Sequence, residues 1–187
     1  MRITGGKYRG QKLVSPQNNR IRPTADRVRE SVFNILEHKS EFSFEDKHVL
    51  DLFCGVGTLG IEALSRGASK ALFVDASPAS LTLCKTNIEK IKQTQHCDFI
   101  RAKAHQTSVK PEFLPIDIVF ADPPYHKNLS EPALLHIIER QYLSSAAYFI
   151  VEMSKQSPEN LHHPNVTQID ERTYGDTIVR FYHFQST

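Results

Sequence analysis

The sequence predicts an α/β protein built on a parallel sheet with helices on both faces. From about residue 46 onward, short apolar runs alternate with helical stretches of roughly ten or more residues, as in consecutive strand–helix–strand units. Right-handed crossovers between such units place helices on both faces of the sheet. Ligands of such sheets bind at the carboxyl ends of the strands, so the residues that follow each strand are the first candidates for a binding site.

The individual elements follow from local periodicity and turn signals. Apolar runs predict strands at 49–53, 71–74, 99–102, 116–121 and 146–151. Helical spacing predicts helices between them at 58–66, 78–92 and 132–142. In the tail we expect two further β-rich segments, 166–170 and 177–184, joined by a turn at Gly175-Asp176.

The N-terminal part is expected to be an extension, residues 1–40, attached to a main domain, residues 41–187. Glycines at 5, 6 and 10 predict a short hairpin over residues 2–14. Thr24 can cap a helix that runs to about Lys39, with arginines projecting from its start.

Charge is distributed unevenly along the chain. Residues 1–30 carry eight Lys and Arg and two acidic side chains, whereas the rest of the chain carries 15 basic and 19 acidic ones. A basic segment on a mildly acidic body favours a polyanionic partner such as nucleic acid. A solvated basic hairpin without a partner would give the same pattern.

Composition excludes several classes of protein. The three cysteines are odd in number and lack CxxC spacing, which indicates a reducing compartment, no disulfide framework and no zinc site. No run approaches the ~18 apolar residues of a membrane span, and the N-terminus lacks the apolar segment of a secretory signal. We therefore expect a cytoplasmic protein with no metal and no membrane association.

A glycine-rich turn follows the first predicted strand. Gly55 and Gly57 allow the backbone to turn tightly and to approach a ligand closely. The second strand ends in Asp75, at the position where dinucleotide-type folds bind ribose hydroxyls. Either feature alone has an ordinary explanation, a turn into a helix or a helix cap. In this order, strand, glycine turn, helix, strand and acid predict a site for an adenosine-containing cofactor.

Asp51 distinguishes between two such cofactors. This acid lies just before the glycines, where it would repel the pyrophosphate of a nicotinamide cofactor. A ligand with an amino group and a sulfonium would be attracted instead. The sequence therefore favours S-adenosyl-L-methionine over NAD.

The most specific signal is Asp122-Pro123-Pro124-Tyr125, directly after the strand at 116–121. The prolines end the strand and hold the backbone in an extended path. The Asp122 carboxylate and the Pro123 carbonyl can each accept one N–H of an exocyclic amine and stabilise the positive charge that develops on it. Tyr125 offers a flat surface for stacking a base. A proline-closed loop with no ligand is the simpler alternative.

These motifs resemble those of a known family. Asp51–Gly60 with Asp75 is similar to the cofactor site of class I methyltransferases, and Asp122–Tyr125 resembles the (D/N/S)PP(Y/F/W) motif of amino-methyltransferases. Arg2–Gly10 together with Arg22–Glu30, RPTADRVRE, resembles the narrower bacterial RsmD family, which methylates N2 of a guanine in small-subunit ribosomal RNA. The resemblance spans the chain from residue 2 to the tail.

The resemblance implies a Rossmann-like sheet of about seven strands whose last strand is antiparallel. It implies a base pocket formed by Asp122, Pro123, Pro124 and Tyr125, and a cofactor site formed by Asp51, Phe53, Gly55, Gly57, Asp75 and Ala104. It also implies that RNA is held by Arg2, Lys7, Arg9, Arg22, Arg27 and Arg29.

One position departs from the family pattern. Relatives usually have an acid or amide followed by alanine after the third strand, near the cofactor adenine, whereas this chain has Lys103-Ala104. Lysine cannot accept a hydrogen bond from the adenine amine. Backbone groups near Ala104 are the alternative contact, unless the alignment is shifted.

The expected reaction is direct in-line methyl transfer by a monomer, without a metal. No covalent enzyme intermediate is expected, because Cys54 is expected to pack as a small hydrophobe rather than act as a nucleophile. The substrate would be small-subunit (16S) ribosomal RNA, free or within an assembling 30S particle. The nearest alternative acts on adenine N6 or cytosine N4 of DNA or RNA. More distant alternatives are an NAD-dependent Rossmann oxidoreductase and a catalytically silent RNA-binding module.

Overall fold

The computed structural model describes residues 1–16, 23–38, 42–124 and 128–186, without the side chains of residues 23–25. The strands are β1 (His48–Leu52), β2 (Lys70–Asp75), β3 (Cys97–Arg101), β4 (Ile116–Ala121), β5 (Leu143–Ser154), β6 (Val166–Tyr174) and β7 (Thr177–Gln185). The helices are α1 (Pro23–Glu37), α2 (Thr58–Ser65), α3 (Pro78–Lys90) and α4 (Ser130–Glu139). Short 3₁₀ turns are η1 (Thr94–His96), η2 (Ala104–Gln106) and η3 (Pro111–Phe113).

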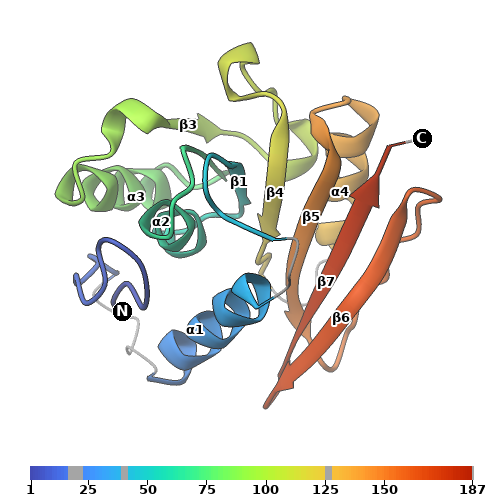
Figure 1. Ribbon diagram of the computed structural model, residues 1–187, viewed down its shortest axis with the longest axis horizontal. Coiled ribbons are helices and arrows are strands. Elements are labelled where there is room, and N and C mark those ends of the chain that lie inside the picture. The colour runs from blue at the N-terminus through green and yellow to red at the C-terminus, as the bar shows by residue number, and fades with distance from the viewer. Residues whose placement is uncertain (17–22, 39–41, 125–127, 187) are drawn as a thin grey trace.

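All strands join one seven-stranded sheet in the order β3-β2-β1-β4-β5-β7-β6 (Figure 1). Strands β1 to β5 pair in parallel, whereas β7 is antiparallel to both β5 and β6. The parallel sheet and the antiparallel last strand are therefore confirmed. The turn at Gly175-Asp176 lies between β6 and β7 as expected, and Gly175 has the positive φ of 61° that such a turn favours.

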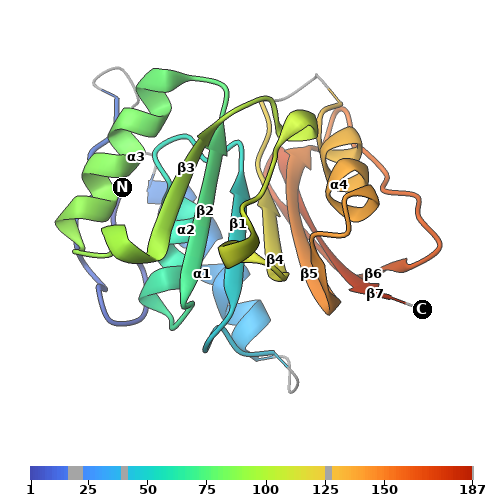
Figure 2. The same ribbon diagram turned by 90° about the horizontal axis from the view of Figure 1, so that it is seen from above.

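The apolar residues form two cores, one on each face of the sheet. On one face α1, α2 and α3 pack around Phe33, Ile61 and Phe73, all fully buried. On the other face α4 packs over Val119 and Phe149. Figure 2 shows α2 and α3 on one side of the strands and α4 on the other. Both faces of the parallel strands are covered, which explains why these strands read as continuous apolar runs.

The N-terminal segment is a reduced form of the predicted hairpin. Within residues 1–16 its two arms pair antiparallel through one bridge, between Arg2 and Lys12, and backbone hydrogen bonds from Ile3 to Gln11 and from Leu13 to Met1 join them, but no strand forms. Gly6 and Gly10, with φ of 70° and 86°, place two tight turns in this short segment. The following helix begins at Pro23, one residue before the predicted cap.

The register brings three functional segments to one edge. Leu52 of β1 pairs with Val74 of β2 and with Ala121 of β4. The residues that follow these three positions therefore leave the sheet side by side at its carboxyl edge. The glycine turn, Asp75 and Asp122 all lie there, as the order of elements predicted.

Candidate active site

The loop between β1 and α2 has an unusual backbone. Gly55 and Gly57 have φ of 55° and 86°, and Phe53 has φ of 60°, which is rare for a bulky side chain. A Cβ atom on Gly57 would lie 2.5 Å from Sγ of Cys84 on α3, whereas a Cβ on Gly55 would meet nothing within 4 Å. One glycine thus allows close packing on α3, and the other leaves the outer side of the loop open.

Asp75 organises this loop. Its Oδ2 accepts a hydrogen bond from the Gly55 amide at 2.9 Å, and its Oδ1 accepts one from the Ser77 amide at 2.7 Å. The N-cap of α3 is Ser77, whose hydroxyl accepts from the Ser80 amide, so Asp75 does not serve as the cap. An ionised carboxylate retains further lone pairs after two such bonds. The side chain can therefore still accept hydrogen bonds from a ligand.

Asp51 points inward rather than into the open side of the loop. It is 1% exposed, and its Oδ2 accepts a hydrogen bond from the Gly60 amide at 2.9 Å. Burial raises the pKa of Asp51 to about 7; the Gly60 hydrogen bond opposes this shift and the charge of Asp75 adds to it. Asp51 would therefore act on a cofactor through its charge and the loop backbone, and a cationic ligand would favour its ionised form.

The Asp122-Pro123-Pro124 segment follows β4 directly. Asp122 and Pro124 are exposed, whereas Pro123 is buried. Pro123 therefore anchors the segment and leaves the carboxylate accessible from solvent. Tyr125, the predicted stacking residue, lies outside the described residues.

A second acid lies close to Asp122. Ala121 pairs with Val151 of β5, which brings Asp122 beside Glu152 on the neighbouring strand. Surrounding protein atoms raise the pKa of the Asp122 carboxyl well above its ordinary value, and the charges of Glu152 and Asp51 raise it further. Because Asp122 remains exposed, water screens part of this effect. A positive charge nearby would return the carboxyl to its ionised form.

Lys103-Ala104, the departure from the family pattern, lies after β3 at the start of η2. Lys103 is exposed, while Ala104 is 5% exposed and packs into the core beneath α4. The carbonyl oxygens of both residues accept hydrogen bonds within the turn, from Gln106 and Thr107. The buried methyl group of Ala104 offers no polar contact, so an adenine contact at Ala104 would have to come from its backbone.

Four of the six basic residues predicted to hold RNA are exposed: Arg2, Lys7, Arg9 and Arg27. Arg22 lies outside the described residues. The exposed four come from the N-terminal loop and from the first turns of α1, so two separate segments form one basic region.

Arg29 corrects the prediction that it projects outward. Its side chain is 6% exposed and lies in the interior beside Asp26, at 3.0 Å, and Glu62, at 3.4 Å. It also donates a hydrogen bond to the carbonyl oxygen of Arg2. A buried guanidinium needs such partners. Arg29 therefore stabilises the contact between α1 and the N-terminal loop and does not face a ligand.

Glu62 of α2 is the centre of this contact. Its carboxylate is fully buried and accepts three hydrogen bonds from the loop, from the Thr4 amide (2.8 Å), the Thr4 hydroxyl (2.7 Å) and the Gly5 amide (2.7 Å). It also pairs with Arg29 and, at 3.0 Å, with Arg66. One carboxylate thus joins the N-terminal loop, α1 and α2.

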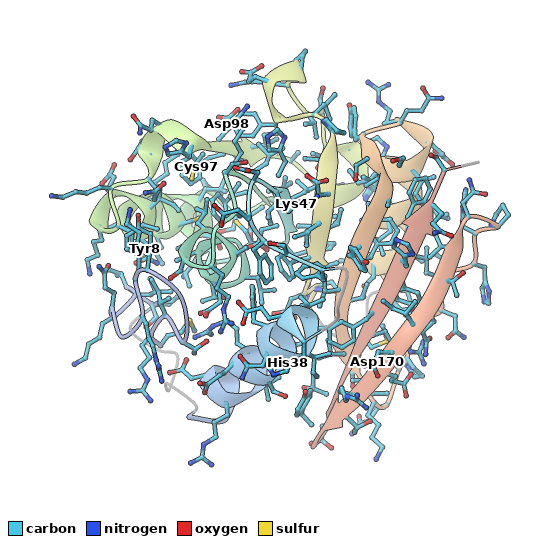
Figure 3. All side chains as sticks on the ribbon, in the orientation of Figure 1. Tyr8, His38, Lys47, Cys97, Asp98 and Asp170 are labelled. Atoms are coloured by element: carbon cyan, nitrogen blue, oxygen red, sulfur yellow. The ribbon has the colours of Figure 1, made fainter. Side chains whose placement is uncertain are left out.

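The loop also follows the end of α2 closely. Gly6 approaches the Ser65 carbonyl so closely that a Cβ would lie 1.8 Å from its oxygen. The Ser65 hydroxyl accepts a hydrogen bond from the Tyr8 amide at 2.9 Å, and the Tyr8 hydroxyl accepts one from the side chain of Gln93. Figure 3 shows Tyr8 between the loop and α3. A glycine at position 6 is therefore required for the N-terminal loop to pack against the end of α2.

Asn87 of α3 connects the extension to the glycine loop. This fully buried amide exchanges two hydrogen bonds with the backbone of Val14, at 2.7 and 3.0 Å. It donates another to the carbonyl oxygen of Val56 at 3.0 Å. The basic extension and the predicted cofactor loop therefore share one support.

Sequence reasoning missed Glu62 and Asn87. Each had a detectable signal: Glu62 lies in an otherwise apolar and small helix, TLGIEALS, and Asn87 lies among apolar positions of α3. A polar residue on a buried helix face requires a partner. The identity of that partner was not visible from the spacing.

Comparison with known proteins identifies the family. The family model described as conserved hypothetical protein 95 matches residues 1–183. Ribosomal RNA small subunit methyltransferase D of Haemophilus influenzae is 35% identical to this chain, with 97% of this chain and 93% of the relative covered. The chain belongs to this methyltransferase family. The protein of the same name from Escherichia coli K12 is 31% identical, with 97% and 89% covered.

Solved structures of the family agree with this fold. The Escherichia coli structure described as "Putative methyltransferase yhhF" superimposes with a TM-score of 0.83 at 28% identity, covering 100% of this chain and 99% of that one. The sheet is thus the class I methyltransferase sheet. Within the described ranges, no three His, Cys, Asp or Glu side chains gather as metal ligands. Nor is any helix there long and apolar enough to cross a membrane.

The Glu62 network yields a stability prediction. Glu62→Gln should lower the free energy of unfolding by about 3 kcal/mol, because it removes the buried charge that both Arg29 and Arg66 share, although Asp26 and Glu37 still pair with them. Urea titration followed by circular dichroism measures the loss. Glu89→Gln, at an exposed position of α3, is the control and should change stability by less than about 0.5 kcal/mol. Equal midpoints for the two variants would contradict the structural role of Glu62.

Proposed function

We propose that the chain transfers a methyl group from S-adenosyl-L-methionine to the exocyclic N2 amine of a guanine in small-subunit (16S) ribosomal RNA. One observation carries the proposal: the accessible Asp122 carboxylate and the glycine loop held by Asp75 lie at the same edge of the sheet. The names of the relatives from Haemophilus influenzae and Escherichia coli support ribosomal RNA as the substrate.

The residues of the loop fit the proposed cofactor. The space outside Gly55 is open, and Asp75 beside it can accept hydrogen bonds from ribose hydroxyls. The acids Asp51 and Asp122 both have raised pKa values and would be stabilised in their ionised forms by a sulfonium and an amino group. S-adenosyl-L-methionine supplies an electrophilic methyl group on that sulfonium. Backbone groups at Ala104 are the proposed contact for the adenine.

The chain's own residues would orient the substrate amine. The Asp122 carboxylate and the Pro123 carbonyl each accept one N–H, which directs the nitrogen lone pair toward the methyl carbon. The positive charge that develops on nitrogen lies beside Asp122 and is stabilised there. The excess proton then leaves to water. Tyr125, which follows these residues in the sequence, is proposed to stack on the base.

A cysteine nucleophile is not part of the proposed mechanism. Cys54, in the glycine loop, is 6% exposed. Its hydrogen bond with Cys84 and its burial raise the pKa of the Cys54 thiol far above its ordinary value. A thiol that stays protonated is a poor nucleophile. We therefore propose direct transfer by a monomer acting in the cytoplasm on ribosomal RNA, free or in an assembling 30S particle.

Asp122 provides the first test of the chemistry. Asp122→Ala should lower the rate of methyl transfer by at least about 10²-fold, because it removes both an acceptor and a negative charge at the reacting amine. Asp122→Asn keeps an acceptor and should retain more activity. Transfer of radiolabel from the cofactor to undermethylated ribosomal particles measures the rate, and calorimetry should show cofactor affinity within a few-fold of wild type. Normal turnover by Asp122→Ala would overturn the assigned role.

The same assay tests the substrate when the product is digested to nucleosides. Label in N2-methylguanosine is the expected outcome. Label on adenine N6 or cytosine N4 would keep the mechanism and reject the guanine assignment. Binding of NAD, without binding of S-adenosyl-L-methionine, would indicate an oxidoreductase instead, and cofactor binding without any transfer to nucleic acid would favour a silent binding module.

Asp51 provides a pH-dependent test. With its pKa near 7 in the free protein, the carboxyl is largely protonated at pH 6 and ionised at pH 8. A cationic ligand binds the ionised form better, so the affinity for S-adenosyl-L-methionine should rise by up to about tenfold over this interval. Calorimetry at both pH values measures the change. The demethylated product, with a neutral sulfur, should show a smaller rise, and Asp51→Asn should lose the difference between the two ligands. Equal pH slopes in wild type and Asp51→Asn would contradict this.

A further inference from the structure

Residues 26–30 of α1 carry two pairs of charged side chains. Asp26 and Arg29, three residues apart, form an ion pair at 3.0 Å. Arg27 and Glu30 have the same spacing one position further along the helix and, together with Asp26, line a pocket. The first pair has a structural role. The second pair has none in the contacts described so far.

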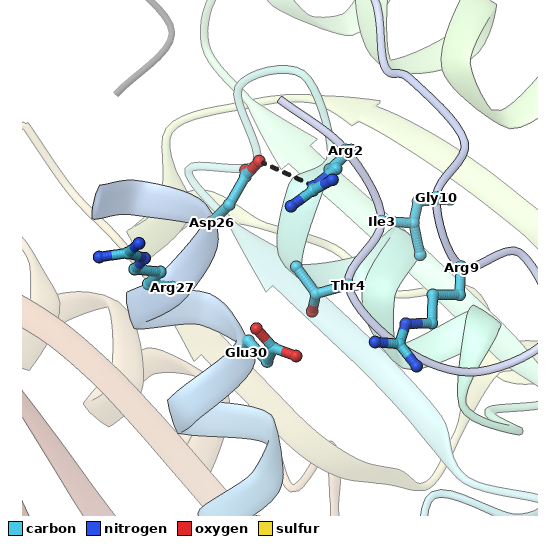
Figure 4. Close-up of a pocket in the computed structure, with 8 residues that line it drawn as sticks. All are labelled: Arg2, Ile3, Thr4, Arg9, Gly10, Asp26, Arg27 and Glu30. Carbon is cyan, nitrogen blue, oxygen red and sulfur yellow. Dashed lines mark ion pairs between the residues drawn. The ribbon is translucent and has the colours of Figure 1, made fainter. Parts of the chain in front are cut away.

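This pocket lies between the N-terminal loop and α1 and has a volume of about 440 Å³. That is within the roughly 300–1,000 Å³ range of small-ligand sites. Figure 4 shows Arg9 from the loop and Glu30 from α1 extending into the space between them, with Arg2 paired to Asp26 above. A second hollow of about 380 Å³ continues along α1 and shares Arg27 and Glu30 with the first.

The charged groups of the pocket are available for a ligand. Within the described part of the chain, no hydrogen bond or ion pair engages the side chain of Arg9, Arg27 or Glu30. Arg2 is 70% exposed, and its only ion pair there, with Asp26, is a long one of 3.9 Å. The hollow is therefore lined by the guanidinium groups of Arg2 and Arg9 and by two carboxylates, those of Asp26 and Glu30. Asp26 is paired with Arg29 and Arg2, whereas Glu30 has no such partner there. Arg27 also lines the hollow, but its guanidinium is directed away from Arg2 and Arg9 (Figure 4).

This mixture of charges indicates the class of ligand. Guanidinium groups bind phosphate through paired N–H donors. A pocket that held only phosphate would be weakened by Glu30, because the carboxylate repels it. A carboxylate does accept hydrogen bonds from the ring and exocyclic N–H groups of an unpaired base, the edges by which proteins read single-stranded RNA. A nucleotide satisfies both kinds of group, whereas a simple anion satisfies only the arginines.

The pocket is also near the proposed site of methyl transfer. Ser31, adjacent to Glu30, lies 2.8 Å (oxygen to oxygen) from the Tyr174 hydroxyl at the β6–β7 turn. The ring of Phe33 packs on Phe120, two residues before Asp122, with ring centres 5.4 Å apart. Figure 1 shows α1 close to the lower ends of β4 and β5. An RNA strand that presents a base to Asp122 would therefore pass this part of α1.

We propose that the pocket binds one unpaired nucleotide of the RNA that neighbours the methylated base. Arg2 and Arg9 hold its phosphate, and Glu30 accepts hydrogen bonds from the Watson–Crick edge of its base. The pocket thereby contributes sequence specificity beside the catalytic site. This inference rests on the proposed function.

The test measures binding of RNA hairpins that contain the methylated position, with each flanking nucleotide replaced in turn. Arg9→Ala should weaken binding of every hairpin alike and lower the slope of log affinity against log salt by about 1. Glu30→Ala should leave the overall affinity unchanged or higher. It should also reduce discrimination at one flanking position by about tenfold or more. The isosteric Glu30→Gln should lose part of that discrimination.

Matched controls are Lys90→Ala and Glu89→Ala on the exposed end of α3, which should change neither quantity. Urea unfolding should show that all variants are folded. Wild-type discrimination that survives intact in Glu30→Ala would overturn this proposal while the methyltransferase function stands. A wild-type chain that neither binds nor methylates ribosomal RNA would overturn the proposed function, and the pocket proposal with it.

Discussion

The buried carboxylate of Glu62 joins parts of the chain that the sheet alone would not hold together. It accepts hydrogen bonds from Thr4 and Gly5 of the N-terminal loop and pairs with Arg29 of α1 and Arg66 beside α2. A carboxylate removed from water requires such full satisfaction, so the loop and the helix are held in one arrangement. That arrangement fixes the position of Arg9 and Arg27 relative to each other and forms the pocket between them.

The carboxyl edge of the sheet, the proposed site of methyl transfer, has the opposite electrostatic character. Asp51, Asp75, Asp122 and Glu152 gather there, and burial together with repulsion among these acids raises the pKa of Asp51 and of Asp122. Such a cluster is unfavourable by itself and becomes favourable when a cation is present. A sulfonium-bearing cofactor and a methylated amine that becomes positively charged both meet that condition. The pyrophosphate of a nicotinamide cofactor is an anion and would add to the repulsion.

The sequence was sufficient to predict the sheet, its order of elements and the positions of Asp51, Gly55, Asp75 and Asp122. Each depends on local pattern and on the rule that parallel strands end at one edge. The direction in which a charged side chain points could not be predicted in this way. Arg27 and Arg29 are equally basic and two residues apart, yet one is exposed and the other buried. That difference depends on Glu62, more than thirty residues away in sequence, and local periodicity carries no information about such a contact.

The two charge regions together constrain how the proposed RNA substrate would approach. Phosphates would be repelled from the acidic edge and attracted to the basic loop and the start of α1, so the proposed function places the RNA backbone at the extension and a base at Asp122. This separation favours a base that is already unpaired or is turned out of its stack. Asn87 hydrogen-bonds to the backbone of both Val14 and Val56 and so fixes the position of the extension relative to the glycine loop. The distance between the proposed phosphate-binding groups and the proposed site of methyl transfer is therefore set by the protein's buried polar contacts.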